Sequence, residues 1–193
     1  HIRSGVGAVA TQAHTNPYLG ICGLERLEQN RSAEEVKASL LRDDPQRDRR
    51  QFHLIDALGS TAAWTGADCG DWAGHRSRDG MAVAGNLLGG EEVLIAMEEA
   101  YLSSDPGWKL GRRLMQALQA GESAGGDRRS PHATSAALQV SGEAAFPLLD
   151  LRIDYHDTAV AELSALYERS QLLWAQAWRD ELAERPILNR EVA

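Results

Sequence analysis

Helices and strands occur in groups along this chain, and this grouping restricts the possible folds more than any other feature. The apolar patterning predicts a strand, two helices, a hairpin, a further strand, two helices, two strands and a last helix. A parallel Rossmann-type sheet would instead alternate one strand with one helix. The order therefore predicts an α+β fold in which helical layers cover a two-layer or split sheet.

Apolar spacing and end signals place these elements. Strands are expected where short apolar runs are bounded by turn residues, at 5–13, 50–66 (a hairpin), 80–86, 135–141 and 148–154. Helices are expected where the spacing is three to four residues, at 15–29, 32–42, 91–103, 108–120 and 157–184. Asn16 before Pro17 suits the start of the first helix, and Ser32 with Glu35 forms a capping-box pattern at the second.

The composition argues against several classes of partner. The 193 residues are 43% hydrophobic, which suits a globular domain with a sizeable core. A net charge of −8, with no basic patch interleaved with aromatics, argues against nucleic acid. No apolar run approaches the roughly 20 residues of a membrane span. Cys22 and Cys69 lie far apart and form no CxxC pair, so we expect no structural metal, no cofactor and a cytoplasmic location.

The stretch "GADCGDWAGHRSRDGMAVAGNLLGG", residues 66–90, contains seven glycines around Cys69, His75 and Asn86. Each glycine costs backbone entropy on folding, so a packed core gains nothing from so many. Glycine does allow a ligand to approach the backbone closely. We therefore expect this stretch to form one wall of a binding cleft.

Other polar residues collect near the ends of predicted strands, where side chains are held rigidly. The candidates for catalysis are Thr11, Gln12, Asn16, Cys69, His75, Asn86 and Asp127, and those for substrate binding are Arg128 and Arg129. Each has a structural alternative. Asn16 suits a helix cap, Cys69 a small buried hydrophobe and His75 a satisfied core histidine. Asp127 with its neighbouring arginines could be a solvated loop pair.

Several long motifs occur together and in order: "RSGVGAVATQAHTNPYLG", "WAGH", "AGGDRR", "SAAL" and "DLRID". From Arg3 to about Leu166 the chain resembles the bacterial domain of unknown function 1028 family, which is assigned to the N-terminal-nucleophile (Ntn) hydrolases. The resemblance implies a four-layer αββα sandwich over residues 1–156, followed by a helical extension over 157–193. It also implies a Thr, Ser or Cys nucleophile whose own α-amine is the base, with an Asn side chain and backbone N–H groups holding the oxyanion.

The sequence departs from this family at its start. The resemblance implies a further strand hairpin that carries the nucleophile, and it is missing from this sequence. The first residue, His1, is not one of those nucleophiles. We therefore expect an amidohydrolase that acts on the C–N bond of a small amide or peptide-like metabolite. A non-catalytic ligand-binding or assembly module with the same fold, and a thiol hydrolase using Cys69, are the alternatives.

The last predicted helix carries an aromatic stripe. Val160, Leu163, Tyr167, Trp174 and Trp178 are expected on one face of it. The stripe could cover the core of its own domain. Because aromatic residues are enriched at interface cores and symmetric dimers are the commonest oligomers, it also predicts a homodimer with Trp174 or Trp178 at the contact.

Overall fold

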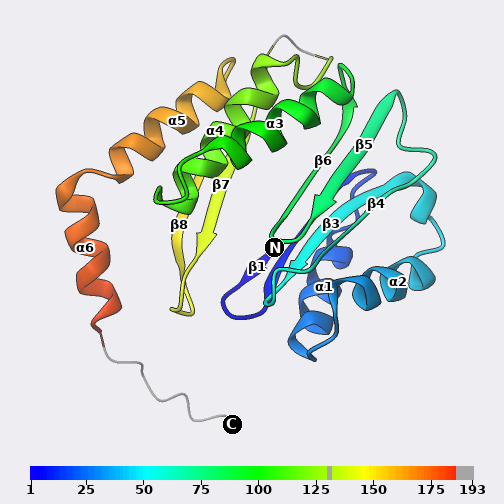
Figure 1. Ribbon diagram of the computed structural model, residues 1–193, viewed down its shortest axis with the longest axis horizontal. Coiled ribbons are helices and arrows are strands. Elements are labelled where there is room, and N and C mark those ends of the chain that lie inside the picture. Colours follow the sequence, from blue (N-terminus) through cyan, green and yellow to red (C-terminus); the bar gives the residue numbers. More distant parts are fainter. Residues whose placement is uncertain (130–131, 186–193) are drawn as a thin grey trace.

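The computed structural model describes residues 1–129 and 132–185 (Figure 1). Within these residues the strands form antiparallel sheets, one of four strands and two of two strands. The four-stranded sheet has the order β1 (Ile2–Arg3), β2 (Gly7–Ala13), β3 (Arg50–Asp56) and β4 (Thr61–Thr65). The two hairpins are β5 (Trp72–Arg78) with β6 (Met81–Leu88), and β7 (Ala136–Ser141) with β8 (Pro147–Ile153).

Helices cover these sheets in groups. The helices are α1 (Pro17–Glu28), α2 (Ala33–Asp43), α3 (Glu91–Ser103), α4 (Leu110–Ser123), α5 (Ala159–Ser170) and α6 (Leu173–Ala183), with a short 3₁₀ turn at Arg47–Arg49. Helices α1 and α2 pack on the four-stranded sheet, α3 packs on β5 and β6, and α4 and α5 pack on β7 and β8 (Figure 1). The protein is thus a mixed fold of helices and antiparallel sheets, as the grouped elements predict.

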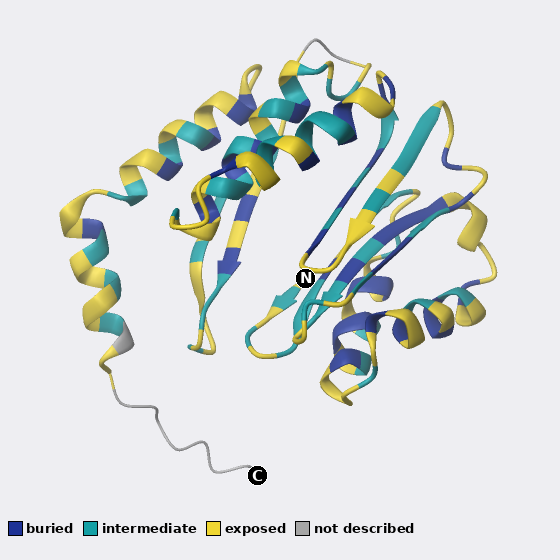
Figure 2. Ribbon diagram, viewed as in Figure 1, coloured by how far each residue is buried: buried dark blue, intermediate teal, exposed yellow. Residues whose placement is uncertain are grey.

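Three apolar clusters hold the layers together. The first joins the four-stranded sheet to α1 and α2 through Val9, Leu24, Leu27, Val36, Leu40, Phe52 and Leu54. The second lies between β7, β8, α4 and α5 and contains Met115, Leu138, Val140, Leu163 and Tyr167. The third lies under α3 and contains Val83, Leu88, Val93 and Leu94. Figure 2 shows buried and exposed positions alternating along these helices, as expected when one face of each helix is covered.

The end signals read from the sequence are confirmed for the first two helices. The Asn16 side chain accepts a hydrogen bond from the backbone N–H of Tyr18 at 3.1 Å. At α2 the Ser32 hydroxyl accepts from the backbone of Glu35 at 3.4 Å, and the Glu35 carboxylate accepts from the backbone of Ser32 at 2.9 Å. This is a complete capping box, so both helices begin where short polar side chains replace missing backbone partners.

Strand β5 is missing from the sequence prediction. Its segment WAGHRSR carries polar residues on both faces, so it lacks the clean apolar alternation of a strand. The structure explains this, because Arg76 and Arg78 both pair with Glu98 of α3, which is 4% exposed. Charged residues therefore occupy a strand face that is covered by a helix, which sequence pattern alone does not indicate.

The prediction of one continuous helix over 157–184 is wrong. The helix is interrupted between α5 and α6, where Leu172 has an extended backbone (φ −61°, ψ 145°). Its N–H donates to the backbone oxygen of Arg169, three residues earlier, whereas an α-helix would use the residue four earlier. The aromatic stripe is therefore split. Tyr167 is 3% exposed in the core, whereas Trp174 is 72% exposed and Trp178 is 56% exposed.

Candidate functional site

The inner face of the four-stranded sheet carries a row of polar side chains. On β3, Phe52 and Leu54 point to the cluster under α1 and α2. Because side chains alternate along a strand, Gln51 and His53 lie on the opposite face, toward the β5–β6 hairpin. Gln12 pairs with Gln51 across the β2–β3 ladder, so it lies beside it on this face. A polar row therefore lies between two layers of strands.

Gln51 is fully buried and bonds directly to the β5–β6 hairpin. Its Nε2 donates to the backbone oxygens of Gly74 and Gly85, each at 2.9 Å, and approaches Thr65 Oγ1 at 2.9 Å. Backbone carbonyls only accept hydrogen bonds, so these contacts fix which end of the amide is nitrogen. Gln51 thus holds the two strand layers in one alignment.

The oxygen of the same amide accepts hydrogen bonds from two further side chains. Gln51 Oε1 accepts from Gln12 Nε2 at 2.6 Å and from Asn86 Nδ2 at 3.3 Å. Gln12 and Asn86 come from β2 and β6, and both were candidates from the sequence. The structure therefore brings them together through a residue that the sequence analysis did not select.

The network reaches the surface at a cavity of about 460 Å³. The walls include Thr65, Cys69, Asp71 and His75, together with the glycine-rich loop between β4 and β5. Thr65 Oγ1 lies 2.8 Å from His75 Nδ1. Burial lowers the pKa of His75, and the positive charge of Lys37 lowers it further, so the imidazole is neutral at physiological pH.

Cys69 lines this cavity but is not placed as a nucleophile. It is 8% exposed, and its thiol donates to the backbone oxygen of Arg50 at 3.2 Å. Burial raises the pKa of the Cys69 thiol, which keeps it protonated at neutral pH. Because the thiolate is the reactive form, this environment supports the structural alternative for Cys69.

The loop after α4 brings charge to the rim of the cavity. An isolated bridge joins Asp127 to Leu88 at the end of β6. Arg128 Nη1 lies 3.8 Å from Asp71 Oδ2, and Asp71 lines the cavity. Arg129 instead bonds back to Asp127, with its Nε 2.9 and 3.0 Å from the two carboxylate oxygens. That contact lowers the pKa of Asp127. Because Arg129 is already paired with Asp127, Arg128 is the better placed of the two arginines for a ligand.

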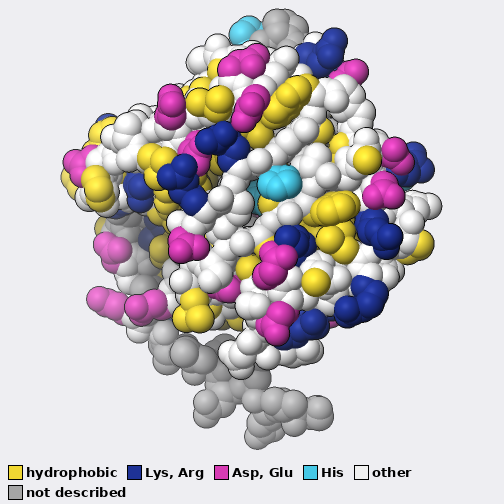
Figure 3. Space-filling view, turned by 45° about the vertical axis from the view of Figure 1, so that its right-hand side comes forward, with side chains coloured by type: hydrophobic (Ala, Val, Ile, Leu, Met, Phe, Trp, Pro, Cys, Tyr) yellow, Lys and Arg dark blue, Asp and Glu magenta, His cyan; other side chains and the backbone are white. Residues whose placement is uncertain are grey.

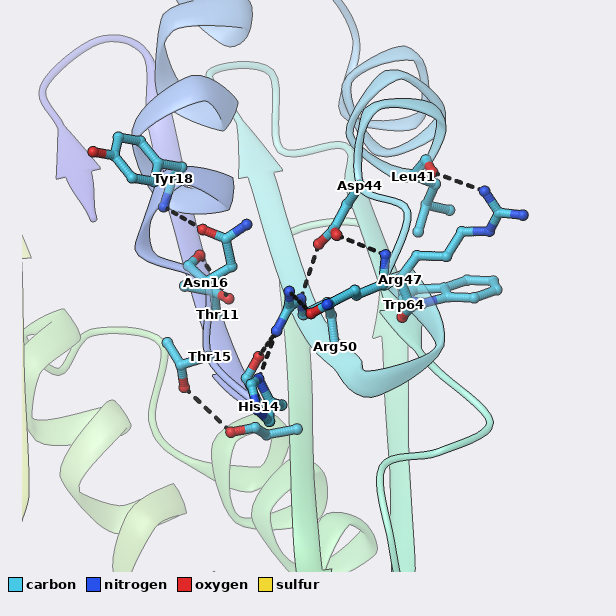
Figure 4. Close-up of polar contacts among 12 residues, drawn as sticks. Thr11, His14, Thr15, Asn16, Tyr18, Leu41, Asp44, Arg47, Arg50 and Trp64 are labelled. Atoms are coloured by element: carbon cyan, nitrogen blue, oxygen red, sulfur yellow. Dashed lines mark hydrogen bonds and ion pairs between the residues drawn. The ribbon is translucent and has the colours of Figure 1, made fainter.

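Thr11 and Asn16 lie outside the network. Thr11 Oγ1 reaches the backbone oxygen of Asn16 at 3.5 Å, and Asn16 caps α1 (Figure 4). The neighbouring polar group in Figure 4 is a buried ion pair, in which Arg50 Nε donates to Asp44 Oδ2 at 2.9 Å. Arg50 also lies 2.8 Å from His14 Nδ1. These contacts tie the β2–α1 loop to β3 and support the structural alternative for Asn16.

His53 was not selected from the sequence, although its surroundings mark it as unusual. It lines a second cavity of about 720 Å³, and its Nδ1 is buried without a hydrogen-bond partner among the described residues. Burial, helped by nearby His75, lowers the pKa of His53 to about 4. The sequence signal for His53 was its position between Phe52 and Leu54. This alternation places a polar residue on the face of β3 opposite the apolar cluster.

Two kinds of feature are absent from residues 1–129 and 132–185. In that part of the chain no three His, Cys, Asp or Glu side chains are grouped so as to hold a metal ion. Within the described helices, none is both long and apolar enough to cross a membrane. Figure 3 shows basic and acidic side chains interspersed on one face of the molecule.

Comparison with known proteins places the chain in a family. The model of a family of unknown function (DUF1028) matches residues 1–163. The crystal structure of protein SPO2555 from Silicibacter pomeroyi, of the same family, matches with a TM-score of 0.81 and 32% sequence identity, over 91% of this chain and 77% of that one. No curated protein was found to match. The family match and the similar fold together show that this chain belongs to the DUF1028 family.

Proposed function

We propose that this protein is a hydrolase of a small amide or peptide-like metabolite, built on the αββα plan of the Ntn hydrolases. The order of packing supports this plan. Helices α1 and α2 cover one face of the four-stranded sheet, the β5–β6 hairpin lies on its other face, and α3 covers the hairpin in turn. In folds of this plan the substrate binds between the strand layers, where this protein has its polar row.

The observation that carries the proposal is the amide cluster around Gln51. An amide-cleaving site must hold the charge that develops on the carbonyl oxygen, and side-chain amides are suitable donors. Among the described residues, Asn86 uses one amide hydrogen in its bond to Gln51, which leaves the other for a ligand. Its strand partner Ala73 lines the cavity of about 460 Å³. Asn86 is therefore our candidate for the oxyanion donor.

Charged residues at the rim of the cavity suggest which amides would bind. The guanidinium of Arg128 is half-exposed beside Asp71, so it could form a charge-assisted pair with a substrate carboxylate. The negative net charge would not attract anions from a distance, so any preference for a carboxylate would come from this local contact. We therefore expect a small amide that carries one carboxylate.

The test is amide hydrolysis by the purified protein. A panel of amino-acid amides, N-acyl amino acids and short peptides is assayed for release of ammonia or amine. Replacing Asn86 by Ala should lower kcat by about 10²–10³-fold, the usual effect of losing one oxyanion donor. Gln119→Ala is the matched control, because Gln119 is an exposed amide on α4 that bonds to Ser164 and does not line the cavity of about 460 Å³. Its kinetics should equal those of the wild type.

Two results would contradict the proposal. Hydrolysis that is equally fast in the Asn86→Ala variant would show that Asn86 is not the oxyanion donor. Compounds that raise the melting temperature of the protein but are recovered unchanged would favour the alternative, a ligand-binding module that retains this fold. Circular dichroism of both variants shows whether a lost activity reflects lost folding.

A further inference from the structure

Thr65 of β4 and His75 of β5 lie in contact in the wall of one cavity. Thr65 Oγ1 and His75 Nδ1 are 2.8 Å apart, and both residues line the cavity of about 460 Å³. A hydroxyl and a ring nitrogen at this distance share one hydrogen. Which of them donates decides whether the pair is a structural bridge or a reactive one.

The contacts of Gln51 favour one direction for that bond. The Gln51 amide nitrogen lies 2.9 Å from each of the two glycine carbonyl oxygens and from Thr65 Oγ1. An amide nitrogen has two hydrogens and accepts none, and the two glycine carbonyls can take both. The Thr65 hydroxyl therefore cannot donate to Gln51, and its hydrogen must point elsewhere. The acceptor that the described contacts offer to this hydrogen is His75 Nδ1 at 2.8 Å, which accepts it in the tautomer that carries the ring proton on Nε2.

We propose that Thr65 is a nucleophile and His75 its general base, forming a dyad between β4 and β5. A nucleophile within hydrogen-bond reach of a base that is ready to accept its proton is the arrangement that activates a hydroxyl. The Gln51 amide nitrogen, 2.9 Å from Thr65 Oγ1, cannot accept the proton of this hydroxyl, so His75 is the base beside it. The lowered pKa of His75 keeps the base neutral at physiological pH.

The inference rests on the proposed function and names the groups that carry it out. Thr65 Oγ1 attacks the substrate carbonyl carbon while its proton passes to His75 Nδ1. The C–N bond then breaks, and the same proton passes to the leaving nitrogen, which gives an ester on Thr65 and a free amine. Water attacks this ester and gives its proton to His75. The C–O bond to Thr65 breaks, the proton returns to the hydroxyl and the carboxylic acid leaves.

The dyad is tested with p-nitrophenyl acetate, an activated ester that acylates reactive hydroxyls without a specific substrate. Intact-mass analysis should show one acetyl group on the wild type, mapped by peptide digestion to Thr65. Thr65→Val should abolish this labelling and Thr65→Ser should retain it. His75→Gln should slow it by about 10²–10⁴-fold, the usual contribution of a general base.

Strands β4 and β5 supply a matched control. Thr61 Oγ1 bonds to Ser77 Oγ at 2.6 Å, so Thr61 bridges the same two strands without an imidazole. Thr61→Val should leave the labelling unchanged, which excludes a general effect of removing a hydroxyl at this junction. Circular dichroism of each variant confirms that it folds. Acetylation at another residue, or labelling that persists in Thr65→Val, would overturn the dyad.

The dyad and the proposed function can fail separately. Amide turnover that survives in Thr65→Val would overturn the dyad and leave the hydrolase proposal standing. Acetylation of Thr65 in a protein that cleaves no amide of the panel would confirm the reactive hydroxyl and contradict the amide substrate.

Discussion

At the scale of single residues, protonation of His53 is coupled to folding. Burial holds the pKa of its imidazole near 4, whereas the unfolded chain binds the same proton near 6.5. Below pH 6.5 the unfolded state therefore binds more protons than the folded state. The stability that the neutral, buried imidazole of His53 contributes is fully present above pH 6.5 and is lost progressively as the pH falls toward 4.

This coupling predicts a loss of stability in mild acid. Between pH 7 and pH 5 the free energy of unfolding of the wild type should fall by about 2 kcal/mol more than that of His53→Gln, whose amide does not titrate. Urea unfolding at the two pH values measures the difference. An equal fall in both proteins would show that His53 is not buried in its neutral form.

At the scale of elements, the turn that leaves β4 depends on one glycine. Gly66 donates its N–H to the backbone oxygen of Arg50 at 2.9 Å. A Cβ at this position would lie 2.3 Å from the backbone oxygen of Asp48 and 2.6 Å from that of Arg47. Backbone atoms cannot turn aside as a side chain can, so the turn that starts the cavity wall has no room for a larger residue.

Gly66→Ala should therefore destabilise the protein by about 1–3 kcal/mol, the usual cost of overpacking. Gly89→Ala is the control, because the nearest atom to its added Cβ would be a Glu92 carboxylate oxygen at 3.8 Å. Thermal unfolding of both variants measures the contrast. If the two substitutions lower the melting temperature equally, the close approach at Gly66 does not limit the turn.

Elements with their own end signals could be predicted from the sequence, whereas strand β5 and the break before α6 could not. Helix α2 carries its capping box in its own residues, and the predicted range 91–103 agrees with α3. Strand β5 depends on ion pairs with Glu98 of α3, and the break before α6 depends on local bonds at Leu172. Neither partner is marked by periodicity.

The candidate site was partly predictable for a related reason. Glycine-rich and strand-end positions pointed to Gln12, His75 and Asn86, which the structure connects through one network. Gln51 and Thr65 were not selected, because each lies inside a predicted hairpin. Their importance comes from facing a second layer of strands, which only the three-dimensional packing shows.

At the scale of the whole molecule, α6 presents apolar side chains to solvent. Leu173 is 87% exposed, Trp174 72% and Trp178 56%. Trp174 and Trp178 are four residues apart and so share one face of the helix. Exposed apolar patches are typical of interaction sites rather than of free monomer surface. We therefore retain the homodimer as a proposal, with α6 at the contact.

The dimer should depend on the two indoles. Light scattering at micromolar concentration should give twice the monomer mass for the wild type and the monomer mass for a Trp174→Ala, Trp178→Ala double variant. Leu58→Ala is the control, because Leu58 is 93% exposed in the β3–β4 turn and should not change the mass. A wild type that runs as a monomer would rule out this contact.

The fixed amide of Gln51 also limits how the sequence can evolve. A single nucleotide change in a Gln codon gives Glu, the replacement closest in shape. At this position it would turn a carboxylate oxygen toward the carbonyl oxygens of Gly74 and Gly85, where only a donor fits. The replacement closest in shape would therefore break the contact between the strand layers, although it is only one nucleotide away.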